Sequence, residues 1–298
     1  MLPVKAKKII AVLITAFVLL GAWRYVVFIQ KKLDNLHTIQ TPQNQNVITE
    51  DPPVVPALPD DISDNALSQD LAFANSSFAE IEAGLSEIET EFAWSDSVSL
   101  PNIENLTASA ITAEAKEKIS RALQNLRLAL VKIELIKNIS QEQQNYLSDS
   151  AQQKITELNE LKQKIEILQN NKASAVIEYR KTEKILKSSS HLSSQILILS
   201  TSEKIIFLSE FMGATENKIK IRLTELNSQN LIAIKNLLLE LVKEKEGAKV
   251  QAEPLLKDAF GDVEFKTILL RLNSAKNSLF SAKEKTASLI NYILQNSL

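Results

Sequence analysis

The chain has 298 residues, with 5 glycines, 8 prolines, no cysteine and 2 histidines. Glycine usually makes up about 7% of a protein, and tight turns and phosphate-binding loops depend on it. Its scarcity argues against most α/β nucleotide enzymes, barrels and sandwiches. The lack of cysteine excludes disulfides, thiolate zinc sites, iron–sulfur clusters and thiol nucleophiles.

The formal net charge of −2 hides a strong asymmetry along the chain. Residues 1–32 contain six basic residues and no acid, and residues 33–115 contain 15 acidic residues and no Lys or Arg. Residues 116–298 contain 28 basic and 21 acidic residues, a net charge of +7. Such a division indicates that the three parts differ in environment or that the acidic part contacts the basic one.

Residues 9–29 form an apolar stretch close to the N-terminus. A helix of this length is about 30 Å long, which matches the hydrocarbon thickness of a bilayer. Its one charged residue, Arg24, lies near the end of the stretch, where a long side chain can reach the lipid headgroups. Trp23 and Tyr25 suit the membrane interface. The stretch predicts a transmembrane helix with the lipid bilayer as its partner.

Two alternatives compete with an uncleaved anchor. A signal peptide would have Lys5, Lys7 and Lys8 as its basic region, but the stretch lacks a good small-residue cleavage site. A buried helix of a soluble domain fits poorly beside a proline-rich segment. Basic residues flank the stretch equally on both sides, so they do not decide which end of a membrane helix faces the cytoplasm. Residues 33–115 contain no basic residue to retain them in the cytoplasm, which favours their export. We predict a single-pass anchor in residues 1–37, with a cytoplasmic N-terminus and the rest outside.

Residues 38–61 contain five prolines and no basic residue. Proline at this density blocks helix formation and favours an extended chain, of about 3.1 Å per residue. The segment is therefore predicted to be a linker. A semi-rigid stalk and a disordered tether fit it equally well.

From residue 62 the hydrophobic period is helical, so residues 62–298 are predicted to form an elongated antiparallel helical bundle or coiled coil. The first helix carries a heptad seam that ends near Trp94, formed by Leu67, Leu71, Ala74, Phe78, Ile81, Leu85, Ile88 and Phe92. The second carries the seam Ile119, Leu123, Leu126, Leu130 and Ile133. A capping box of Ser140 and Gln143 predicts the start of a third, which ends at Asn170.

Further helices are predicted for the rest of the chain, namely 173–187, 192–226, 231–250 and 264–294. The serine run 188–190 predicts a kink or turn between the first two. No stretch after residue 61 alternates convincingly with a period of two, so no strand is predicted. Helices of about 25 to 35 residues exceed the usual mean of about 11, which favours an elongated bundle with antiparallel neighbours.

Residue types that carry catalysis or bind metals are scarce. His37 and His191 have no Asp, Glu or His three or four residues further on, and both are predicted to be surface or capping residues. The acids of residues 80–91 fall between apolar positions, so they are predicted to be solvated or to face a partner rather than to bind a metal. No glycine fingerprint or nucleophile motif is present. We predict no catalytic, cofactor-binding or metal-binding residue and no small-molecule substrate.

Nucleic-acid binding is not predicted either, because the basic residues are interleaved with acids and aromatic residues are few. The densest basic group, Lys218, Lys220 and Arg222, is interpreted as a helix face. The acidic helix at 67–92 is predicted to pack against the basic helices, with its acids setting the register. The alternative is that its acidic face points outward and recruits a partner.

Several segments carry a resemblance to known sequences. They are the acid-spaced heptad ending at Phe92, the segments 139–143 (ISQEQ) and 158–166 (LNELKQKIE), and the alanine-and-leucine seam 272–282. In these segments the chain resembles a loose group of uncharacterised exported, membrane-anchored helical proteins of reduced-genome candidate bacterial phyla. The resemblance implies an envelope location and a helical fold, and it transfers no active site.

Together these patterns predict a non-enzymatic, membrane-anchored helical scaffold or interaction protein on the extracytoplasmic side. Its helical faces would contact a protein partner or a second copy of the chain. The alternative is a cytoplasmic-facing, spectrin-like membrane tether that organises a cytoskeletal or division assembly. The sensor region of a receptor would lack a visible output domain, and an efflux adaptor would need a β-rich domain.

Overall fold

The computed structural model describes residues 62–298 except 101, 169, 227–230, 262 and 297–298. The predicted anchor at 9–29 and the predicted linker at 38–61 lie outside the described residues. Within the described part, the chain is all-helical and has no strand, as predicted. Its elements are α2 (Asp64–Ser97), η1 (Ile103–Asn105), α3 (Ala108–Ile133), α4 (Gln141–Glu166), α5 (Lys172–Glu225), α6 (Leu231–Ala252), α7 (Leu255–Asp258) and α8 (Phe265–Asn296).

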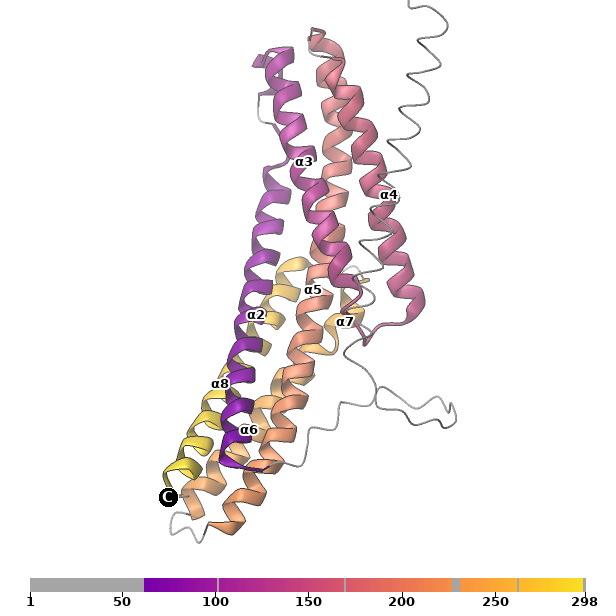
Figure 1. The fold of residues 1–298 in the computed structure, drawn as a ribbon. Coiled ribbons are helices and arrows are strands. Elements are labelled where there is room, and N and C mark those ends of the chain that lie inside the picture. Colours follow the sequence, from indigo (N-terminus) through magenta and orange to yellow (C-terminus); the bar gives the residue numbers. More distant parts are fainter. Residues whose placement is uncertain (1–61, 101, 169, 227–230, 262, 297–298) are drawn as a thin grey trace, which may run out of the picture. The chain divides into compact units, whose positions relative to one another are not determined.

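The long helix α5 is the axis of this helical domain (Figure 1). It contacts α2, α3, α4, α6, α7 and α8. Its 54 residues extend over about 80 Å. Helices α3 and α4 lie along its N-terminal part, α6 and α8 lie along its C-terminal part, and α2 runs antiparallel to it (Figure 1). The domain is therefore an elongated arrangement of helices built on one shared spine.

The middle of α5 is enclosed on every side. All eight side chains of residues 196–203 are buried, which covers more than two helical turns. A helix buried all round cannot show the one-sided apolar stripe of a surface helix. Its buried positions instead mix Ile and Leu with small polar residues, including Ser200, Thr201 and Ser202. These small side chains allow neighbouring helices to approach closely.

Of the kink or turn predicted at 188–190, the turn is wrong, because α5 continues without a break from Lys172 to Glu225. The hydroxyls of Ser188 and Ser189 donate to the carbonyl of Ile185, at 2.9 and 2.8 Å. The hydroxyl of Ser190 donates instead to the backbone carbonyl of Glu91 on α2, at 3.1 Å. The serines therefore find partners inside a helix, and packing outweighs their preference for turns.

Other helix boundaries agree with the sequence patterns. The Ser140 hydroxyl accepts from the Gln143 backbone N–H at 3.2 Å, and the Gln143 side chain accepts from the Ser140 N–H at 2.9 Å. This confirms the predicted capping box. Helices α3, α6 and α8 also match predicted helices, whereas the short helix α7 was not predicted. None of the helices within the described residues is long and apolar enough to cross a bilayer.

The acids of α2 pair with basic residues of other helices, as predicted for the acidic helix. Asp70 is buried and accepts from Lys218 Nζ at 3.0 Å and from the Thr215 hydroxyl at 3.1 Å. More exposed pairs are Asp64–Arg222, Glu80–Lys204 and Glu87–Lys132. Exposed pairs contribute about 0–1 kcal/mol each, so the enclosed Asp70–Lys218 pair is the one that constrains the register of α2 on α5.

At Gly84, α2 packs tightly against α5. A methyl group added there would lie 2.6 Å from the Thr201 hydroxyl oxygen, which is too close for a normal contact. Thr201 is itself buried in the fully enclosed part of α5. Gly84 is therefore needed for its small size, because it allows the two helices to pack closely.

We predict that Gly84→Ala destabilises the domain by about 1–3 kcal/mol, because the added methyl overpacks this contact. The measurement is the free energy of unfolding from urea denaturation followed by circular dichroism. Adding Thr201→Ala should recover part of the loss, since it removes the atom that the methyl meets. Each single variant is measured alongside the double variant.

Gly247→Ala is the matched control, because its methyl would meet Ser278 at an ordinary 3.6 Å. Alanine has the higher helix propensity, so this variant should be up to about 1 kcal/mol more stable than the wild type. Equal effects of the two glycine substitutions would contradict the close contact.

Candidate functional site

The described residues contain no group of three His, Asp or Glu side chains placed to hold a metal ion. His191 is exposed on the surface of α5, away from a helix end, and His37 lies outside the described residues. The basic residues Lys218, Lys220 and Arg222 each form an ion pair with an acid. The best candidate for a functional site in the described part is therefore a cavity that is lined by buried polar groups.

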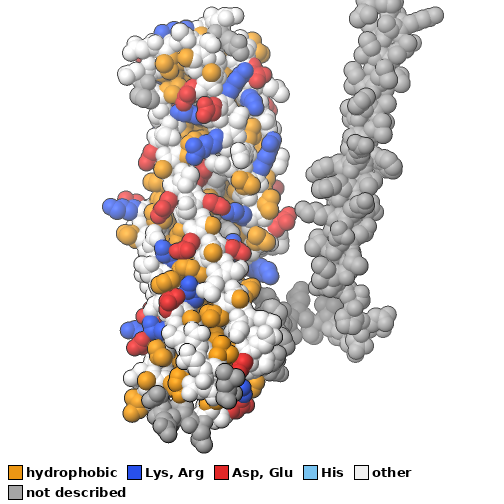
Figure 2. All heavy atoms as spheres, turned by 60° about the vertical axis from the view of Figure 1, so that its left-hand side comes forward, with side chains coloured by type: hydrophobic (Ala, Val, Ile, Leu, Met, Phe, Trp, Pro, Cys, Tyr) orange, Lys and Arg blue, Asp and Glu red, His pale blue; other side chains and the backbone are white. Residues whose placement is uncertain are grey.

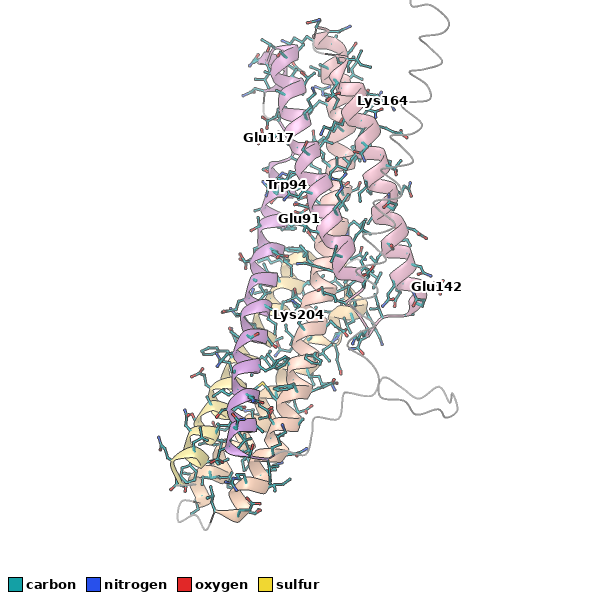
Figure 3. All side chains as sticks on the ribbon, in the orientation of Figure 1. Glu91, Trp94, Glu117, Glu142, Lys164 and Lys204 are labelled. Atoms are coloured by element: carbon teal, nitrogen blue, oxygen red, sulfur yellow. The ribbon has the colours of Figure 1, made fainter. Side chains whose placement is uncertain are left out.

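One such place lies where α2, α3 and α5 meet. A cavity of about 260 Å³ opens between these helices. Figure 3 shows Glu91 and Trp94 on α2, at the level at which α3 passes. The cavity is lined by Ser86, Glu87, Thr90, Glu91, Arg121, Asn125, Leu128, Ala129, Ser193 and Leu197. The lining of the cavity is therefore partly polar and partly apolar.

Glu91 is the most unusual residue of this site, because its side chain is only 4% exposed. Asn125 Nδ2 donates a hydrogen bond to its Oε2. Its Oε1 is enclosed and has no hydrogen-bond partner within the described part of the chain. The prediction that the acids of 80–91 are solvated or partner-facing is therefore wrong for Glu91, which α3 and α5 cover.

Burial raises the pKa of Glu91, because the charged carboxylate loses its hydration. The nearby Ser190 hydroxyl, the hydrogen bond from Asn125 and the positive charge of Arg121 oppose this shift, and desolvation remains the larger effect. A buried carboxyl with a raised pKa in a cavity wall is a common feature of functional sites.

Two further residues shape the cavity. The guanidinium of Arg121 lies over the ring of the buried Trp94, 5.3 Å from its centroid. Within the described residues, Arg121 forms no hydrogen bond or ion pair, so its donors remain available to a ligand. The Ser193 hydroxyl is buried and, like Glu91 Oε1, has no hydrogen-bond partner there.

The sequence contains one signal for this site. Gly84 and Glu91 are seven residues apart on α2, which places them on the same helix face, and Trp94 follows three residues later. The same face also carries Glu87, which is exposed, so the face alone does not distinguish the buried acid. The contributions of α3 and α5 depend on the tertiary fold.

No protein-family model, curated protein or solved structure matches this chain. The resemblance to exported helical proteins therefore stays a prediction.

We predict that Glu91 makes stability fall as the pH rises. The folded protein keeps the Glu91 proton to a higher pH than the unfolded chain, whose glutamate pKa is about 4.3. The stabilising contribution of protonated Glu91 is complete below that value and is lost as the pH rises through the raised folded pKa. Glu91→Gln stays neutral and removes this dependence.

The measurement is the free energy of unfolding at a series of pH values for wild type and Glu91→Gln. The wild type should lose on the order of 1–3 kcal/mol relative to the variant across this window. Glu89→Gln, which changes an exposed acid on the same helix, should keep the wild-type slope. Parallel curves for wild type and Glu91→Gln would show that desolvation of Glu91 is unimportant.

Proposed function

We propose that this chain is a non-enzymatic, membrane-anchored helical scaffold or interaction protein, displayed on the extracytoplasmic side. The observation that carries the proposal is α5, a spine of about 80 Å on which the other described α-helices pack. Such a spine holds binding faces at fixed positions far from a point of attachment. The apolar residues 9–29 would supply the attachment, and the proline-rich residues 38–61 would separate it from the helices.

An exposed apolar stripe on α3 supports the interaction role. Leu128 and Val131 of α3 are 57% and 65% exposed, and Leu135, in the turn just after α3, is 58% exposed. Leu128 and Val131 are three residues apart and lie on one side of the helix, so with Leu135 they form an exposed apolar strip at the C-terminal end of α3. A helix of a partner protein, or of a second copy of the chain, would cover such a strip.

The charge distribution supports contact with protein more than with nucleic acid. Figure 2 shows acidic and basic side chains interspersed over one face of the helical domain. Ion pairs also join different helices, as between Lys249 of α6 and Glu210 of α5. A nucleic-acid surface would instead need basic residues that are gathered together and free to meet phosphates.

The proposal predicts that Val131 meets another protein outside the cell membrane. Val131→Cys would be the only cysteine in the chain, so an impermeant reagent that joins a thiol to an amine acts at one defined position. Added to intact cells, this reagent should give a crosslinked product that remains in membranes after a carbonate wash. A product of twice the 33.2 kDa chain mass indicates a second copy, and any other mass indicates a different partner.

Ile177→Cys is the control, because Ile177 is 57% exposed on α5 and lies outside the α3 stripe. It should react with a simple impermeant thiol reagent but give much less crosslinked product. Crosslinking of Val131→Cys only after lysis would favour the cytoplasmic-facing tether. Loss of the chain in the carbonate wash would contradict the membrane anchor, and equal products from both positions would contradict a specific α3 contact.

A further inference from the structure

Helix α6 carries an exposed apolar face in addition to the face that packs on α5 and α8. Ile232 is 80% exposed, and Leu239 and Val250 are exposed as well. Leu239 follows Ile232 by seven residues and Val250 follows it by 18, which is five full turns. The three side chains therefore lie along one side of the helix, in a strip about 27 Å long that we call the α6 strip.

A hollow lies at the C-terminal end of the α6 strip, between α6 and the first half of α8. It measures about 410 Å³ and is lined by Val250, Gln251, Pro254, Leu270, Arg271 and Ser274. Leu270 of α8 is an exposed apolar side chain, like Val250 of α6. The strip thus has a protruding isoleucine at one end and, at the other end, a hollow that has room for an aliphatic side chain.

We propose that two copies of the chain associate through the α6 strip, with their α6 helices antiparallel and Ile232 of each copy seated in the hollow of the other. Ile232 and Val250 lie nine residues before and nine residues after Leu241. A twofold axis at the level of Leu241 therefore brings each isoleucine to the hollow of the other copy. A second copy is the partner that presents the same protrusion and the same hollow at the same spacing in reverse order.

The charges beside the strip fit this antiparallel register. The axis places Lys243 within one residue of the level of Glu240 of the second copy, and Glu246 within one residue of its Lys235. Twofold symmetry repeats each of these opposite-charge pairs. Lys235 and Lys243 form no ion pair within the described residues, whereas the other two lysines of α6 pair with acids of α5. The free lysines are therefore available to the acids of a second copy.

The size of the strip sets the strength of the contact. Stable complexes bury about 800 Å² per partner, and one face of a single helix offers less. We therefore expect a reversible dimer with a Kd on the order of 10 μM, which attachment of both chains to one membrane would strengthen by raising their effective concentration. The pairing rests on the interaction role proposed above, but its failure is distinguishable, because Val131→Cys tests α3 and not α6.

Disulfide crosslinking of the full chain in detergent micelles tests the register, because the chain has no cysteine of its own. Asn236 and Glu246 lie five residues on either side of Leu241, so Asn236→Cys in one copy should meet Glu246→Cys in the other. In either variant alone, the two thiols would be separated by ten residues along the helix pair, about 15 Å, which is too far for a disulfide.

The mixture of the two variants, with a tag on one chain and a mild oxidant added, should give at least tenfold more disulfide-linked dimer than either variant alone. Equal yields from the mixture and the single variants overturn the antiparallel pairing. Absence of a mixed product at a chain concentration of about 100 μM overturns it as well.

Ile232→Asp tests the seating of the isoleucine. It should weaken self-association tenfold or more, because it would bring a charge into an apolar hollow. Ile232 is exposed in the single chain, so the variant should fold as the wild type does, which circular dichroism checks. Ile167→Asp is the matched control, because Ile167 is equally exposed but lies just after α4. Sedimentation equilibrium should show an unchanged Kd for the control, and equal Kd values for the two variants overturn the proposal.

A charge exchange tests the polar contacts. Lys243→Glu should weaken the dimer about threefold, because it would place like charges next to each other across the axis. Adding Glu240→Lys restores the opposite-charge pair with its signs reversed, so the double variant should regain the wild-type Kd. A double variant that associates no more tightly than Lys243→Glu would overturn this register. Self-association that fails while Val131→Cys still gives its crosslinked product would overturn the α6 pairing alone.

Discussion

The enclosure of the middle of α5 is the constraint on which the rest of the structure depends. Because residues 196–203 are buried on all sides, their polar groups depend on the surrounding helices for hydrogen bonds, and the Ser202 hydroxyl has none within the described residues. Glu203 shows how a charged group is accommodated there. Its carboxylate accepts from the backbone N–H groups of Lys137 and Asn138, at 3.1 and 3.2 Å, and so holds the connection from α3 to α4 against the spine.

The same constraint explains why the cavity lies beside α5. At Gly84, α2 and α5 leave no room for even a methyl group between them. Seven residues further along α2, the larger Glu91 side chain is covered by α3 and meets Asn125. The cavity lies at this second level, where α2, α3 and α5 meet. A stiff spine with polar groups enclosed at fixed positions suits a scaffold.

Local patterns in the sequence were sufficient for most helices but not for the central one. The capping box at Ser140 depends on residues three positions apart, and heptad seams depend on a repeating period, so both can be read from the sequence alone. The continuity of α5 through the serine run is accompanied by a hydrogen bond from Ser190 to the backbone carbonyl of Glu91, 99 residues away, which no local pattern contains. The burial of Glu91 likewise needs α3 and α5, so an alternating acidic pattern could not reveal it. The membrane anchor remains a prediction from residues 9–29.

Hydrogen exchange of the backbone amides of α5, followed by mass spectrometry, tests whether α5 is the continuous buried spine of the domain. Exchange reports local opening, and an enclosed continuous helix opens only with the whole domain. If α5 is the buried spine, the amides of residues 186–206 exchange slowly and together, including those across the serine run. Fast exchange confined to residues 188–192, with slow exchange on both sides, would show that the helix is broken there and that α5 is not a continuous spine.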